Sequence, residues 1–268
     1  MGAHASTYRI PRRTLQPFSR FSILLGACYT WTAPHSLNPD GNLPDCRFLH
    51  RHKTPKFATF SSLLQMTTKY QFEGIRSQIL LDLSPAYPTK LSEYEESTCR
   101  GEAVFGVPTP HPNSVLELFV KCNVAFALPF AYYRACITDD HPSLVSSTEG
   151  ARLSPDTLKA ALRGQARLRE GGMELASELA FQNCTAWRCP GNSSSGRAPV
   201  FDWIHPNAAP TGAIFEKGTF PAVDGYCSKC TQVFAQGLST AKEKTWKNLP
   251  SYFDLLPWDN EIYRPTQS

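Results

Sequence analysis

Acidic residues are absent from residues 1–39, although four arginines lie there: Arg9, Arg12, Arg13 and Arg20. A basic, acid-free segment is typical of a mitochondrial presequence, and the apolar stretch 21–33 resembles the core of a secretion signal. Prolines interrupt both patterns, so we favour a third interpretation, in which residues 1–56 form an irregular or disordered leader without a targeting role. For the location of the protein we favour the cytoplasm or the nucleus. If the leader is a targeting segment, the protein would instead be mitochondrial or secreted.

Charge and long apolar runs are also scarce. Charged residues make up 19% of the 268-residue chain and leave a net charge of only +4, which argues against a generic polyanion binder, so nucleic acid is not an expected partner. The most apolar uncharged run, residues 122–133, is shorter than the roughly 20 residues that a membrane-spanning helix needs. No membrane association is therefore expected.

Enzyme signatures are missing as well. The sequence has no P-loop, no GxGxxG, no GxSxG and no HExxH motif. Its seven histidines show no pairing with a plausible nucleophile or carboxylate motif. We therefore expect no catalytic residues, no cofactor-binding residues and no small-molecule substrate.

Apolar residues recur at helical spacing from residue 57 onward, so the expected fold class is mainly α. Two such sets predict a short helix pair: Phe60, Leu63, Leu64 and Thr67 in the first helix, and Phe72, Ile75, Ile79 and Leu83 in the second. Leu64, Ile75 and Ile79 are expected to face one interior. Pro85 and Pro88 are expected to end the second helix.

Further helices are predicted later in the chain. One covers residues 116–128, and a short turn or helix follows over 130–137. Another starts at residues 154–156, where Ser, Pro and Asp supply an N-cap, a first-position proline and an acidic first turn. The two glycines at 171–172 are expected to kink or split this helix. The last predicted helix lies within residues 230–250.

Two cysteine pairs are the strongest chemical feature: four residues separate Cys184 from Cys189, and two separate Cys227 from Cys230. Two close pairs suit tetrahedral zinc, because each pair supplies two thiolates from one tight turn. We predict one structural zinc bound by these four residues. His205 lies between the pairs and could replace one thiolate, but a lone histidine beside a proline is more often a solvated loop residue. Reduced structural cysteines and disulfides remain alternative interpretations.

Two other groups of residues receive plain interpretations. Cys122 and Cys136 lie within apolar helical patterns, so we expect small core residues. Lys242, Lys244 and Lys247 form a small basic helix face, which we interpret as solvated rather than as a nucleic-acid contact.

Residues 64–76 resemble the closing helix pair of a BTB/POZ domain, in which an LLxLAxKYxxxxIR stretch packs the last two helices. Later segments resemble the C-terminal extension of a large fungal BTB-domain family: residues 115–122, 128–136, 153–156, 225–230, 234–237, 241–246, 249–250 and 252–253. The resemblance covers residues 57–258. It implies a protein-interaction module with a helical, cysteine-bearing extension.

The resemblance covers only the end of the BTB domain and not its first half. A complete BTB domain has about 100 residues and begins with the elements that build its dimer interface, whereas only 56 residues precede the matching helix pair. We expect the front half to be missing or replaced, and the chain to be a monomer. The face around Phe60, Leu63 and Phe72 is then expected to be covered by the C-terminal helices.

Four segments are predicted: a leader at 1–56, closing and linking helices at 57–150, a helical extension with the cysteine pairs at 151–258, and a tail at 259–268. The expected function is a non-enzymatic protein–protein interaction module with an unknown protein partner. One alternative is a small zinc-dependent enzyme, which would need an open coordination position. The other is a nucleic-acid-binding module, which salt-sensitive affinity would reveal.

Overall fold

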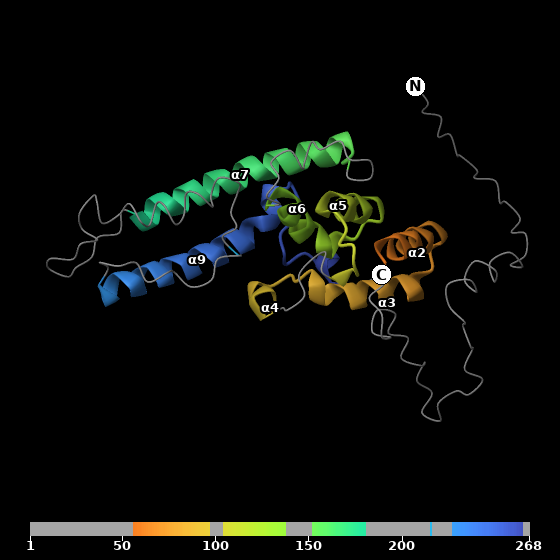
Figure 1. Cartoon of the computed structure of the whole chain (residues 1–268), viewed down its shortest axis with the longest axis horizontal. Helices are drawn as coiled ribbons and strands as arrows, with labels where there is room; N and C mark the ends of the chain where they lie inside the picture. Colours follow the sequence, from red (N-terminus) through yellow and green to blue (C-terminus); the bar gives the residue numbers. More distant parts are fainter. Residues whose placement is uncertain (1–55, 97–103, 138–151, 181–214, 216–226, 265–268) are drawn as a thin grey trace, which may run out of the picture. The chain divides into compact units, whose positions relative to one another are not determined.

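The computed structural model of the chain describes residues 56–96, 104–137, 152–180, 215 and 227–264 (Figure 1). This described part contains seven α-helices and no strand, which confirms the mainly α prediction. None of these helices is both long and apolar enough to cross a membrane. The described residues belong to one compact unit, Arg47–Ser268. The predicted leader, apart from Lys56, and the predicted boundary at residue 150 lie outside the described residues.

The predicted helix pair is present as α2 (Phe57–Tyr70) and α3 (Glu73–Leu83). Gln71 links the two helices in the left-handed conformation, with φ 56°. The buried positions follow the predicted spacing in α2 and in the second half of α3: Phe60, Leu64 and Thr67, then Ile79, Leu80 and Leu83. After α3, Pro85 lies in the short 3-10 helix η1 (Ser84–Ala86), so the helix ends where the prolines predict.

The prediction that Ile75 faces the interior is wrong, because its side chain is 48% exposed. The first turn of α3, from Glu73 to Ile75, is exposed along its whole length, and burial begins only at Ile79. On the same helix, the Arg76 side chain reaches the main chain at Cys122 and Asn123. The first turn of α3 therefore extends past the core and leaves Ile75 in contact with solvent.

The middle of the chain folds into α4 (Leu91–Glu96), α5 (Pro112–Lys121), the 3-10 helix η3 (Ala125–Ala127) and α6 (Leu128–Ile137). The expectation that one helix continues to residue 128 is wrong. The chain turns at Asn123, whose φ of 51° cannot continue a right-handed helix. Pro129 then lies in the first turn of α6, where the missing N–H costs no helical hydrogen bond. Cys122 and Cys136 are both buried, as predicted.

Two long helices complete the described part: α7 (Pro155–Ala180) and α9 (Ser228–Tyr252). Ser154 precedes α7 as predicted, and its hydroxyl lies 2.7 Å from the Thr157 hydroxyl. The expected break at Gly171 is absent, because α7 runs as one helix to Ala180. A side chain at Gly171 would lie only 3.3 Å from the Tyr252 hydroxyl, so α9 packs closely at this position. Figure 1 shows α7 and α9 side by side.

The Phe253 ring joins three elements just after α9 ends. It stacks on Tyr132 of α6, with ring centroids 4.9 Å apart and an interplanar angle of 16°. Its other neighbour is Gly164 of α7, where an added Cβ would overlap the ring. Phe253 is 2% exposed. Glycine is therefore required at position 164 by packing and not by backbone conformation.

Two glycine substitutions within α7 test this packing. Gly164→Ala should lower the free energy of unfolding by roughly 1–3 kcal/mol, because the new methyl group displaces the Phe253 ring. Gly172→Ala is the matched control, since nothing lies within 4 Å of its added Cβ. Alanine there should raise the free energy of unfolding by about 0.5–1 kcal/mol through helix propensity. Urea denaturation measures both, and a Gly164→Ala variant as stable as the wild type would contradict the packing.

Candidate functional site

Half of the predicted zinc ligand set lies at the start of α9. Cys227 is the N-cap residue, with φ −76° and ψ 159°, and Cys230 lies in the first helical turn. Cys227 is half-buried and Cys230 is buried. Cys184, Cys189 and His205 lie outside the described residues, so the four-cysteine set stays a prediction.

The position of Cys227 and Cys230 at the N-terminal end of α9 differs from that of Cys122 and Cys136, although Cys230 is also buried. Burial raises the pKa of Cys136 to about 12 and also raises the pKa of Cys122. Those two thiols stay protonated at neutral pH, in agreement with a packing role. Within the described ranges, no group of three or more His, Cys, Asp or Glu residues could hold a metal ion.

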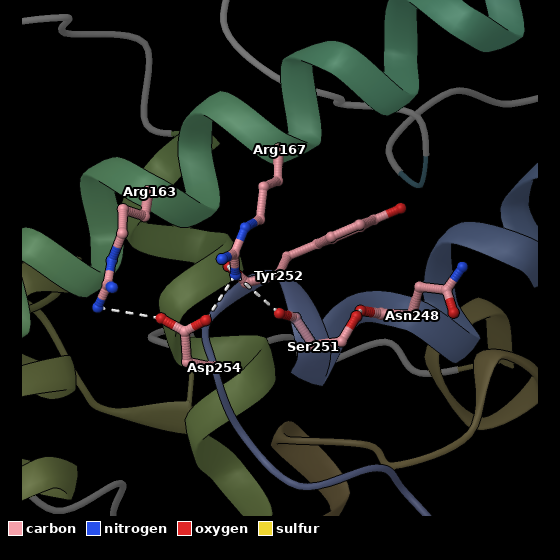
Figure 2. A network of polar contacts seen from close by, with 6 residues as sticks. All are labelled: Arg163, Arg167, Asn248, Ser251, Tyr252 and Asp254. Atoms are coloured by element: carbon pink, nitrogen blue, oxygen red, sulfur yellow. Dashed lines mark hydrogen bonds and ion pairs between the residues drawn. The ribbon is translucent and has the colours of Figure 1, made fainter.

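A polar network holds the end of α9 against α7 (Figure 2). Arg167 Nη1 donates to the carbonyl oxygens of Ser251 and Tyr252, at 3.0 and 2.9 Å. The same nitrogen lies 2.7 Å from Asp254 Oδ1, and Arg163 Nη2 lies 3.0 Å from Asp254 Oδ2. Arg167 therefore binds the last carbonyl groups of α9, which have no partner within the helix.

The Asp254 carboxylate is set up for ion pairing rather than proton transfer. The hydrogen bond from Arg167 lowers the pKa of Asp254, and the charges of Arg163 and Arg167 lower it further. A carboxylate with a lowered pKa stays ionised at neutral pH, whereas a general acid or base needs a pKa near the working pH. The ionised carboxylate thus stabilises the contact between α7 and the end of α9.

Other charged side chains also bind helix ends. Arg76 Nη2 donates to the carbonyl oxygens of Cys122 and Asn123, at 3.1 and 3.2 Å, just after α5 ends. Glu117 Oε2 accepts a 2.9 Å hydrogen bond from the Ser154 backbone N–H, just before α7 begins. These long-range contacts satisfy main-chain groups at helix termini.

The basic face predicted on α9 is partly neutralised. Lys242 Nζ lies 3.6 Å from Glu95 Oε1, and Lys244 Nζ lies 3.7 Å from Glu174 Oε1. The two pairs offset part of the positive charge that a polyanion would need. The Lys244 side chain is exposed, as the solvated interpretation expects, whereas the Lys242 side chain is only 12% exposed and is not a solvated part of this face.

Apolar side chains are exposed where α2 meets α3, and we define Tyr70, Phe72 and Ile75 as the corner surface. Tyr70 and Ile75 are each 48% exposed, and Phe72 is half-buried. The Tyr70 and Phe72 rings lie 6.1 Å apart, and Lys69 Nζ lies 5.4 Å from the centroid of the Tyr70 ring. Three large apolar residues within six positions are thus partly or largely exposed, and a positive charge lies next to one of them.

The face of the helix pair around Phe60, Leu63 and Phe72 is only partly covered in the way that we predicted. Phe60 is fully buried, but the ring that packs on it, at 4.9 Å, is Phe105. Phe105 precedes α5, and so lies before the C-terminal helices that were expected to cover this face. Leu63 is half-buried, and Phe72 belongs to the corner surface.

No family model matches the chain, and comparisons with curated proteins and with solved structures likewise give no match.

Zinc content tests the four-cysteine prediction. Protein purified under reducing conditions without chelator should carry about one zinc per chain, and Cys227→Ser with Cys230→Ser should remove it. Cys122→Ala is the control, because this buried thiol should not affect zinc content. Chelation should loosen the C-terminal third, since structural zinc contributes about 10–16 kcal/mol in small peptides. Elemental analysis that finds no zinc in the wild type ends the hypothesis.

Proposed function

We propose that the chain is a non-enzymatic protein–protein interaction module that contacts another protein through the corner surface. The carrying observation is the exposure of Tyr70 and Ile75, each 48% accessible, next to half-buried Phe72. Exposed aromatic and branched apolar side chains that lie together mark interaction surfaces more often than scattered ones do. Tyrosine in particular is enriched at interfaces, since it buries a large ring and keeps a hydrogen-bonding hydroxyl.

The scaffold under the corner surface supports this role. Phe60 and Leu64 of α2 and Ile79 of α3 are fully buried, so both helices are anchored in the core. Arg76, which follows Ile75, is tied to the main chain after α5 through two hydrogen bonds. A surface held on anchored helices needs little ordering when a partner binds, which lowers the entropic cost of association.

The resemblance to BTB/POZ proteins gives independent support. The motif over residues 64–76 covers the end of α2, the Gln71 link and the start of α3, and therefore spans the corner surface. We further propose that the chain belongs to the fungal BTB-domain family. We expect it to be a monomer and to bind one structural zinc in its C-terminal extension. The partner is an unidentified protein.

Site-specific cross-linking tests the proposal. A photoreactive benzoylphenylalanine at position 75 of the full chain should yield a discrete cross-linked product in cells, and Tyr70→Glu should abolish it. The matched control places the same group at Leu81, also exposed on α3 but on a different face of the helix. Ile75→Asp should keep the wild-type melting temperature, because surface substitutions stay within about 0.5 kcal/mol.

Sedimentation equilibrium shows whether the partner is a second copy, and we expect a monomer. Identical products from positions 75 and 81, or no product from position 75, would remove the support for the corner surface.

A further inference from the structure

One helical turn separates Cys227 from Cys230 at the start of α9. Cys227 is the N-cap residue, and Cys230 is the third residue of the helix. The main chain closes this turn, because the Thr231 N–H donates to the Cys227 carbonyl oxygen at 3.1 Å. The Thr231 hydroxyl donates to the same oxygen at 3.4 Å. The helix itself therefore fixes the spacing of the two cysteines.

This spacing suits a disulfide bond. In a helical turn, the Cα atoms of residues three apart lie about 5 Å from each other. A disulfide needs Cα atoms that are about 4.4–6.8 Å apart. The side chains of an N-cap residue and of the third helical residue also lie next to each other, as the capping box shows, in which each of them bonds the main chain of the other. Cys227 and Cys230 can therefore form a disulfide while α9 stays helical.

The two side chains differ in exposure. Cys227 is half-buried, whereas Cys230 is 5% exposed and belongs to the hydrophobic core together with Phe234, one turn later. Thiol–disulfide exchange depends on access of the attacking sulfur to the reagent. Cys227 is therefore the residue that meets a disulfide from solution, and Cys230 is the residue that can react with Cys227 afterwards.

We propose that Cys227 and Cys230 form a redox-active pair, which a low-molecular-weight disulfide such as oxidised glutathione converts reversibly into an intramolecular disulfide. First, the Cys227 thiolate attacks one sulfur of oxidised glutathione, so that a mixed disulfide forms and one glutathione leaves as a thiol. The Cys230 thiolate then attacks the Cys227 sulfur, which joins the two cysteines and releases the second glutathione as a thiol. Two electrons and the two cysteine protons thus pass to two glutathione molecules.

Cys122 and Cys136 are not arranged for this exchange. Each of them is only 2% exposed, and fourteen positions separate them along the chain. Burial raises the pKa of Cys136 to about 12 and also raises the pKa of Cys122, whereas the thiolate is the form that attacks a disulfide. We therefore expect oxidised glutathione to leave both thiols unmodified in the folded chain.

The redox state of the pair determines whether it can bind a metal. Zinc binding needs thiolates, and a disulfide supplies none. Oxidation of Cys227 and Cys230 would therefore release the zinc that we propose for these residues, and this consequence alone rests on the proposed function. The exchange itself needs no zinc.

Disulfide mapping of the full chain tests the proposal directly. Trypsin cleaves after Lys217, Lys229 and Lys242, so the two cysteines fall on separate peptides, 218–229 and 230–242, with one cysteine each. The folded protein, with and without prior chelation, is treated with oxidised glutathione, and remaining thiols are alkylated before digestion. Mass spectrometry should find the two peptides linked after chelation, and excess reduced glutathione should separate them again.

Two variants test the order of attack. Cys230→Ala keeps an apolar side chain in the core and should retain one glutathione on Cys227, because no second thiol displaces it. Cys227→Ala should take up glutathione on Cys230 at least about tenfold more slowly, since that sulfur is buried. Equal rates for the two variants would contradict the assignment of Cys227 as the attacking residue.

The proposal is overturned if peptides 218–229 and 230–242 of the chelated wild type stay unlinked, or if they are linked to other cysteines instead. Zinc analysis of the same samples gives a separate result. A chain that holds no zinc but forms the disulfide ends the zinc prediction and keeps the redox-active pair. A chain that holds zinc but forms no disulfide after chelation has the opposite outcome.

Discussion

The contact between Arg167 and the end of α9 is the interaction on which most of the described C-terminal structure depends. One guanidinium group of α7 binds the carbonyl groups of Ser251 and Tyr252 and the carboxylate of Asp254. This contact fixes where α9 ends relative to α7, and so places Phe253 over Gly164 and against Tyr132. Trp246, two turns earlier in the same helix, depends on this position.

Helix ends in this protein are completed by side chains from other segments. Arg76 binds carbonyl groups after α5, Glu117 binds the N–H group before α7, and Trp258 binds the carbonyl group that Pro250 leaves open within α9. A buried backbone group without a partner costs about as much as a lost hydrogen bond. A proline-rich chain of mostly short helices has many helix ends, and each of these contacts also joins two elements.

The lowered pKa of Asp254 makes its contact with α7 depend on pH. The contact contributes fully to the free energy of unfolding above the pKa of an unfolded aspartate. This contribution is lost as the pH falls through the pKa of Asp254 in the folded state.

The sequence predicts the existence of the helices better than their limits. Spacing alone identifies α2, the buried half of α3 and α9, because a helix that packs on one face must repeat its apolar residues every three to four positions. The same spacing includes Ile75 wrongly, since it cannot show where a helix extends past the core. The end of α5 depends on the backbone at Asn123, and the continuity of α7 through Gly171 depends on packing against Tyr252. The left-handed turn matches a local preference of asparagine, whereas the packing of Tyr252 beside Gly171 is not a local property of the sequence.

Some candidate sites are likewise visible in the sequence, and others depend on tertiary packing. The pair Cys227 and Cys230 is visible as a motif, and the structure adds that it begins a helix. The corner surface and the burial of Phe215 cannot be read from the sequence, because both depend on how distant segments pack. Arg167 carries no signal at all in one sequence, since its partners lie more than 80 residues away.

A comparison of two arginine variants tests the central role of Arg167 most directly. Arg163 binds only the exposed Asp254 carboxylate, whereas Arg167 also binds two carbonyl groups of α9. Urea denaturation should show that Arg167→Met lowers the free energy of unfolding by about 1–2 kcal/mol, as expected for two lost hydrogen bonds. Arg163→Met should lower it by less than about 0.5 kcal/mol, as for a surface ion pair. Equal losses for the two variants would contradict the account, because the carbonyl contacts would then contribute nothing.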